Sequence, residues 1–151
     1  MSRCWVTIFP DCPRGWIEYN FYCYKWIRAK LTWFEAFDVC KANNGNLAGI
    51  PNEDVNDFLS EYIPYGQAGD YCWIGGYEHD EGFWAWDDGR PWGYQNWKEG
   101  EPNHENGNTE DCLSLITWNK PDLNEEPGLW DDLDCDLPMS FVCAKSKQLN
   151  V

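Results

Sequence analysis

Residues 101–112 read Glu101-Pro102-Asn103-His104-Glu105-Asn106-Gly107-Asn108-Thr109-Glu110-Asp111-Cys112. Carboxylate and amide oxygens stand at both ends of this stretch, and a later segment, Trp130-Asp131-Asp132, adds two more carboxylates. Calcium typically takes about 6–8 oxygen ligands of this hard kind. The pattern therefore predicts a calcium site that leaves coordination positions open for a ligand, made of Glu101, Asn103, Glu110, Asp131 and Asp132.

Two helices are expected upstream of this stretch. Thr32, with Glu35 three residues later, forms a capping box at the start of the first helix, and Asn43-Asn44-Gly45 ends it. Asn52 can cap the second helix, which carries one apolar face and ends before Pro64. Both helices belong to the first half of the chain.

Strands are expected before the first helix and throughout the second half of the chain. Runs rich in aromatic and β-branched residues predict them at 21–27, 71–76, 83–89, 112–118, 129–133 and 140–144. Residues 90–109 carry little regular signal, and a loop of that length in a compact domain is usually functional. Helices first and strands later predict an α+β domain with its site on the long loop.

The cysteine content points to an oxidising compartment. The chain has 151 residues, which is the size of one domain, and eight cysteines. No Cys-x-x-Cys pair occurs, so thiolate zinc sites and thioredoxin-like redox chemistry are not expected. An even count in a small domain predicts a disulfide framework and a secreted, extracellular protein.

Charge and motif content exclude several classes of function. A formal charge of −15 opposes binding to nucleic acid and favours cations as partners. No apolar run is long enough to predict a membrane span. No Ser/His/Asp constellation or His-Glu-x-x-His motif occurs, and Asp87-Asp88-Gly89 is interpreted as a turn after a strand rather than a glycosidase pair. The protein is therefore not expected to be an enzyme.

In order and spacing, a set of short motifs resembles the C-type lectin-like domain family from about Cys12 to Lys145. The resemblance implies that family's fold, with two helices, mixed antiparallel sheets and a long calcium-binding loop region. It is to the long form of the domain, of the Glu-Pro-Asn type found in secreted invertebrate-like lectins. The motifs are Trp73-Ile74-Gly75-Gly76, Trp86-Asp87-Asp88-Gly89, Asn96-Trp97, Glu101-Pro102-Asn103, Glu110-Asp111-Cys112, Trp130-Asp131-Asp132 and Phe141-Val142-Cys143.

The resemblance also implies a disulfide pairing. It pairs Cys40 with Cys143 and Cys112 with Cys135, and the long form adds Cys12 with Cys23. Cys4 and Cys72 are left over. They can pair with each other or bridge to a second subunit, and we expect the interchain bridges and hence a homo-oligomer, such as a disulfide-linked dimer.

The family's sugar-binding members suggest what the calcium site does. There, the segments that match Glu101-Pro102-Asn103, Glu110 and Asp131-Asp132 hold one calcium ion, with a cis peptide bond before the proline. The same side chains touch the sugar, and the Glu-Pro-Asn order is typical of members that bind mannose, glucose, N-acetylglucosamine or fucose. The resemblance thus implies a calcium-dependent lectin that binds glycans, for innate recognition or agglutination.

One residue departs from the family pattern and leaves an alternative open. The family usually has Asn where this chain has Asp131, and a carboxylate cannot donate a hydrogen bond to a sugar hydroxyl. The alternative function is a module of the same fold that binds galactose-type sugars, protein, ice or mineral. Trp92 and Tyr94, in the long loop, are candidates for secondary contacts with a glycan or for core packing.

Three parts of the chain are expected. Residues 1–11 are interpreted as an N-terminal extension, residues 12–146 as the carbohydrate-recognition domain and residues 147–151 as a C-terminal tail. One sugar site binds weakly, so linked sites in a dimer would raise the avidity without new contacts.

Overall fold

The computed structural model describes residues 11–66, 70–80, 82–102 and 111–147. In this part of the chain, two helices and one mixed sheet confirm the predicted α+β class. The elements are α1 (Trp33–Ala42), α2 (Glu53–Tyr62), β1 (Ile17–Tyr19), β2 (Tyr22–Leu31), β3 (Asn46–Leu47), β4 (Tyr71–Asp80), β5 (Phe83–Trp86), β6 (Asp111–Ile116), β7 (Trp130–Asp134), β8 (Met139–Ser146) and the short 3₁₀ helix η2 (Pro121–Leu123).

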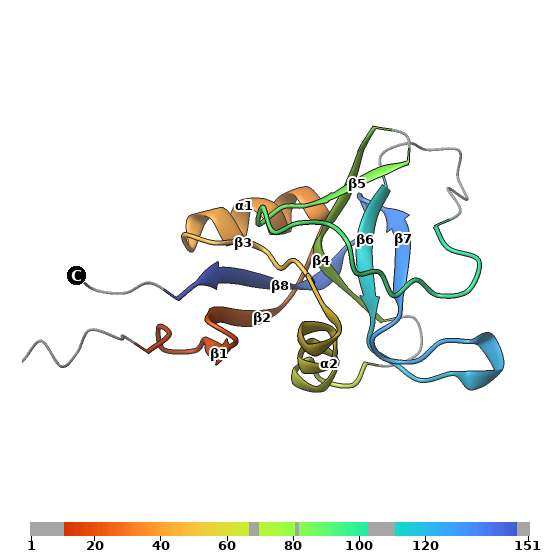
Figure 1. Ribbon diagram of the computed structural model, residues 1–151, viewed down its shortest axis with the longest axis horizontal. Coiled ribbons are helices and arrows are strands. Elements are labelled where there is room, and N and C mark those ends of the chain that lie inside the picture. The colour runs from red at the N-terminus through yellow and green to blue at the C-terminus, as the bar shows by residue number, and fades with distance from the viewer. Residues whose placement is uncertain (1–10, 67–69, 81, 103–110, 148–151) are drawn as a thin grey trace, which may run out of the picture.

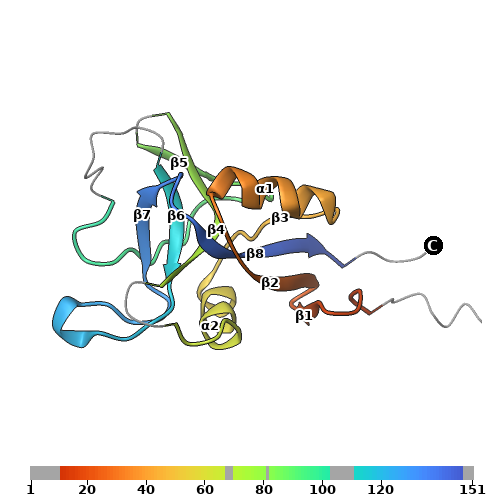
Figure 2. The same ribbon diagram turned by 180° about the vertical axis from the view of Figure 1, so that it is seen from behind.

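The strand order brings distant parts of the chain together. The sheet runs β1-β2-β8-β4-β6-β7, while β3 pairs with β8 and β5 pairs with β4. The C-terminal strand β8 is antiparallel to β2 and parallel to β4, so it closes the domain beside its first strands. In Figures 1 and 2, α1 lies above β8 and α2 lies below it, and β6 and β7 lie at the opposite end of the molecule from β1.

Both helix caps form as the sequence predicts. The amide of Glu35 donates to Oγ1 of Thr32 at 3.2 Å, and the amide of Thr32 donates to Oε1 of Glu35 at 3.0 Å. At α2, the amide of Val55 donates to Oδ1 of Asn52 at 3.0 Å. These bonds satisfy amides that the first turn of a helix leaves without partners.

Strand β4 is longer than predicted. Its glycines were expected to end the strand after Gly76, yet it continues to Asp80. A Cβ at Gly75 would lie 2.5 Å from the carbonyl oxygen of Leu47, and one at Gly76 would lie 2.5 Å from the Leu113 side chain. The two glycines therefore permit close approach of neighbouring strands instead of terminating β4.

Aromatic residues contribute the largest side chains of the core. Trp73 and Trp130 are fully buried, one in each of the two hydrophobic clusters that flank the sheet. The indole N–H of Trp130 donates to Oδ1 of Asn56 at 2.8 Å, and that of Trp73 donates to backbone carbonyls at 3.1 Å. These two indoles keep their polar atom satisfied in this way.

A buried ion pair anchors the loop that follows β5. The side chains of Arg90 and Asp88 are 10% and 4% exposed and lie 2.7 Å apart. Arg90 also donates to the hydroxyl of Tyr24 and to the carbonyl of Gly49, and its guanidinium stacks 3.9 Å above the Tyr22 ring. Each polar group has a partner, which a buried charge requires.

Candidate functional site

Three of the five predicted calcium ligands come together. Carboxylate oxygens of Glu101, Asp131 and Asp132 all lie within 4.8 Å of one another. Asp131 and Asp132 are buried, at 8% and 7% exposure, and Glu101 is half-buried. Three close carboxylates repel one another, and a divalent cation bound between them would relieve that repulsion.

Backbone pairing explains how Glu101 reaches β7. The amide of Trp130 donates to the carbonyl of Asn96 at 2.9 Å, and the amide of Lys98 donates to the carbonyl of Trp130 at 2.8 Å. The amide of Glu101 then donates to the carbonyl of Lys98 at 2.9 Å and closes a turn. This segment therefore runs beside the first residue of β7. The peptide bond between Glu101 and Pro102 is cis.

Pairing with β6 fixes the other two carboxylates. Asp131 lies opposite Ser114 and Asp132 lies opposite Leu113 in the antiparallel register. The Ser114 hydroxyl donates to the backbone carbonyl of Asp131 at 2.9 Å. The β7 backbone is thus held in place from β6 on one side and from the 96–98 segment on the other.

Asn103 and Glu110, the remaining predicted ligands, lie outside the described residues. Glu101 and Pro102 lead directly to the first of them, and Asp111, the first residue of β6, follows the second. Their participation in a calcium site stays a prediction.

A lysine lies close to the carboxylate cluster. Nζ of Lys98 is 2.8 Å from Oε2 of Glu125, and the two side chains are 21% and 6% exposed. The hydrogen bond to Glu125 raises the pKa of Lys98, and the negative charges of Asp131 and Glu101 raise it further. Lys98 is therefore a positive charge near the cluster, held by Glu125 in the segment after η2.

Sequence reasoning missed this pair. In residues 78–136, where acids dominate, the bases are Arg90, Lys98 and Lys120. The sequence offered one signal for the role of Lys98: it is a single base, three residues before Glu101, in a segment dominated by acids. Glu125 lies in an excursion between β6 and β7 that carries η2 and projects from that end of the molecule (Figure 1). Glu125 comes to lie beside Lys98 because the segment between β6 and β7 turns back toward residue 98, and no local sequence pattern predicts that turn.

Trp92 and Tyr94 pack around Trp130. Their ring centroids each lie 5.8 Å from that of Trp130, and Trp92 also lies 4.7 Å from Trp86. Both rings are half-buried against the core. They support the residue that precedes Asp131, and their contact with a glycan stays a prediction.

Three disulfides join the pairs that the resemblance implied: Cys12–Cys23, Cys40–Cys143 and Cys112–Cys135. Cys72 is a free thiol with no exposed surface, and burial raises its pKa to about 12. The Cys72 side chain lies in a hydrophobic core cluster, so a bridge from it would need the core to open, and its pairing with Cys4 or with a second subunit stays a prediction. Cys4 itself lies outside the described residues.

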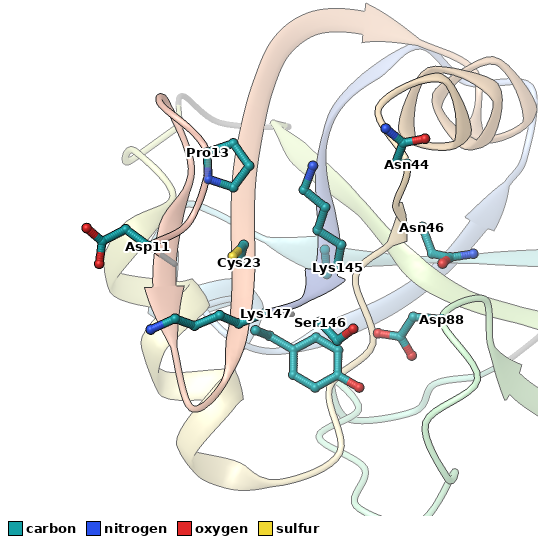
Figure 3. A pocket seen from close by; sticks show the side chains of 11 residues that line it. Asp11, Pro13, Cys23, Asn44, Asn46, Asp88, Lys145, Ser146 and Lys147 are labelled. Atoms are coloured by element: carbon teal, nitrogen blue, oxygen red, sulfur yellow. The ribbon is translucent and has the colours of Figure 1, made fainter. Parts of the chain in front are cut away.

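A cavity of about 630 Å³ lies at the other end of the domain, near the termini. Figure 3 shows Asp11, Lys145 and Lys147 along its wall. Nζ of Lys145 donates to the carbonyl of Asn43 at 3.1 Å, and Nζ of Lys147 lies 3.5 Å from Glu18. Because both lysines have partners within the domain, we interpret this cavity as a structural gap beneath the N-terminal hairpin.

Comparisons with known proteins agree with this geometry. The family model described as the Lectin C-type domain matches residues 29–145. Human C-type lectin domain family 10 member A is 34% identical over 138 residues, which cover 87% of this chain and 39% of that protein. The chain thus spans well under half the length of that relative. The galactose-specific lectin nattectin of Thalassophryne nattereri is 31% identical over 139 residues, which cover 90% of this chain and 81% of that protein.

Solved structures show the same fold. The carbohydrate-recognition domain of the mouse scavenger receptor C-type lectin superposes with a TM-score of 0.75 at 27% identity, covering 93% of this chain and 100% of that one. A calcium-independent type II antifreeze protein gives 0.74 at 26% identity, covering 89% and 94%. None of these names describes an enzyme, which agrees with the prediction of binding without catalysis.

Within the described residues, neither helix is long and apolar enough to cross a membrane.

Proposed function

Because this chain belongs to the C-type lectin domain family, we propose that it is a calcium-dependent lectin that binds vicinal hydroxyls of mannose-type sugars. The observation that carries the proposal is the cluster of Glu101, Asp131 and Asp132, whose carboxylates lie within 4.8 Å of one another at one end of the sheet. Hard carboxylate donors in a half-buried position suit calcium.

Asn103 and Glu110 complete the proposed ligand set. The bound ion would supply two open coordination positions for adjacent sugar hydroxyls. The protein's part is to hold the ligands in place and to form hydrogen bonds with the same hydroxyls. A carboxylate accepts from a hydroxyl and an amide donates to it, so Glu101 and Asn103 would fix the orientation of one hydroxyl between them.

Asp131 changes one of these contacts. Where an asparagine would donate to the sugar, the Asp131 carboxylate accepts, so the hydroxyl facing it must act as the donor. The extra negative charge also strengthens the attraction for a divalent ion. We therefore propose that Asp131 favours calcium binding and narrows the sugar orientations that the site accepts.

The proposal extends to assembly and localisation. Three disulfides fit a secreted domain that folds in an oxidising compartment. Because Cys72 is buried, Cys4 is left as the cysteine that could join two chains. A linked dimer would carry two sugar sites and could agglutinate glycan-bearing particles for innate recognition.

The names of two similar proteins suggest functions other than calcium-dependent mannose binding. Nattectin, at 31% identity, is named as a galactose-specific lectin, while the antifreeze structure is named as calcium-independent. Retention on mannose-agarose and galactose-agarose, in calcium and then in EDTA, separates these functions. We expect retention on mannose-agarose in calcium, elution by EDTA, and weak retention on galactose-agarose.

Two variants locate the binding. Asp132→Asn removes a clustered carboxylate and should abolish retention. Asp122→Asn is the matched control, because Asp122 is an exposed acid of η2 that lies outside the cluster, and this variant should be retained like the wild type. Retention on mannose that survives EDTA, or an equal loss in both variants, would show that the proposed site is wrong.

A further inference from the structure

A second cleft, of about 430 Å³, lies between β2 and the segment that follows α2. Trp26, Arg28 and Lys30 line its β2 side. The pairing of β2 with β8 is irregular between Ile27 and Leu31, and all three side chains line the same cleft. Residues 64–66 form the facing wall, and Glu101, Asp131 and Asp132, the proposed calcium ligands that the structure describes, do not line the cleft.

Trp26, on the β2 side of the cleft, is fixed in position. Its backbone amide donates to the hydroxyl of Tyr62 at 2.9 Å, and its indole N–H donates to Oγ of Ser140 at 3.2 Å. A ring held in this way presents an apolar face to the C–H groups of a sugar ring at little cost in side-chain entropy. Tyr65, on the facing wall, is 73% exposed and offers a second ring to the same ligand.

Gly66, next to Tyr65, and Asp70 both bond to Thr117. The amide of Gly66 donates to the carbonyl of Thr117 at 2.8 Å, and the hydroxyl of Thr117 donates to the carbonyl of Asp70 at 2.9 Å. The facing wall is therefore pinned to the end of β6, and the cleft does not depend on a loop closing over it.

The charged part of the cleft suits an anion. Nζ of Lys30 lies 3.6 Å from Asp70, and these side chains are 66% and 41% exposed, so the pair is weak and a ligand can compete for the lysine. Arg28 is exposed and has no carboxylate partner among the described residues. A guanidinium presents a planar fork of donors that matches a sulfate or carboxylate group.

We propose that this cleft is a second, calcium-independent binding site for a sugar that carries a sulfate or carboxylate group. The sugar ring packs between Trp26 and Tyr65, and the anionic group lies against Arg28 and Lys30. The cavity volume is within the range of about 300–1,000 Å³ that is typical of small-ligand sites. This second site is separate from the proposed calcium site, and the inference holds whether or not the calcium site binds sugar.

Titration in EDTA tests the proposal, because chelation removes the proposed calcium site from the experiment. Amide chemical shifts of the ¹⁵N-labelled chain are followed while N-acetylglucosamine 6-sulfate, galacturonic acid or neutral N-acetylglucosamine is added. We expect saturable shifts with at least one of the two anionic sugars, weaker shifts with the neutral one, and a loss of affinity at high salt. Which anionic sugar binds more tightly identifies the preferred anion.

Single substitutions in the cleft test whether the amide chemical-shift changes come from binding there. Arg28→Ala and Tyr65→Ala should each weaken binding by about tenfold, because each removes one side of the contact. Arg14→Ala, at an exposed arginine elsewhere on the surface, removes the same charge and should leave binding unchanged. Both tested side chains are exposed, so the variants should keep the wild-type fold and spectrum.

Three results would overturn the inference: no saturable shift in EDTA, equal affinity in Arg28→Ala and Arg14→Ala, or binding of inorganic sulfate as tight as that of the sugar sulfate. The last would mean that the aromatic rings contribute nothing. Loss of mannose retention in calcium would refute the proposed lectin function alone and would leave this site untouched.

Discussion

Replacing Asp131 by asparagine should make the calcium-free protein more stable and the calcium effect smaller. Asp131 has two carboxylate neighbours, Glu101 and Asp132, within 4.8 Å. Two unit charges at that distance repel by about 3 kcal/mol at an effective dielectric constant of 20. Lys98 offsets part of this repulsion, and the side chains can move apart, so we expect Asp131→Asn to gain about 1–2 kcal/mol in EDTA.

Thermal unfolding followed by circular dichroism measures both effects. For a domain of this size, about 1–2 kcal/mol corresponds to a rise in Tm of about 2–8 °C in EDTA. In calcium the difference in stability between the variant and the wild type becomes smaller, because the variant has lost a charge that attracts the ion. A calcium affinity about tenfold lower reduces the ligand-induced stabilisation by about 1.4 kcal/mol at the same free calcium concentration.

Asp122→Asn is the control for net charge. It removes one negative charge from an exposed position in the same acidic segment, and its free energy of unfolding should stay within about 0.5 kcal/mol of the wild type. The reasoning is refuted if Asp131→Asn lowers Tm in EDTA, or if calcium raises Tm equally in the variant and the wild type.

Three further predictions follow from buried groups. Arg90→Ala should cost about 3–5 kcal/mol in urea unfolding, because it leaves the buried Asp88 charge without its partner, and a loss under 1 kcal/mol would contradict this. The Cys72 thiol, with its pKa raised to about 12 by burial, should resist thiol reagents at pH 8 until the protein is unfolded, and rapid labelling of the native state would contradict that burial. Burial also raises the pKa of Tyr24 and of Tyr71, so both stay neutral in the folded state after their unfolded counterparts ionise. Stability should therefore fall as pH rises above about 10, and absorbance at 295 nm should show tyrosines that ionise only on unfolding.

Local sequence signals predicted the helices well, because a cap and a helical period act over a few residues. Thr32 with Glu35, and Asn52, each place a helix start that the structure reproduces. Strand ends were harder to predict. Gly75 and Gly76 suggested an end to β4, but the contacts that require glycine there come from β6 and from Leu47, far away in the sequence.

The site was predicted in part for a similar reason. Short motifs identified Glu101, Asp131 and Asp132, and the fold brings these carboxylates together. The Lys98–Glu125 pair forms because the segment between β6 and β7 turns back toward residue 98. Tertiary packing sets the position of that turn, and the local sequence does not predict it. Alternation of apolar residues also cannot distinguish a tryptophan that packs on Trp130 from one that faces a ligand, so Trp92 stayed ambiguous until its neighbours were known.

Saturation transfer from the protein to methyl α-mannoside, recorded first in calcium and again after EDTA is added, shows whether the sugar binds and whether its binding needs calcium. We predict a clear transfer signal in calcium that disappears on chelation and returns when calcium is restored. A signal that persists in EDTA, or no signal in saturating calcium, would contradict the assignment of this domain as a calcium-dependent lectin for mannose-type sugars.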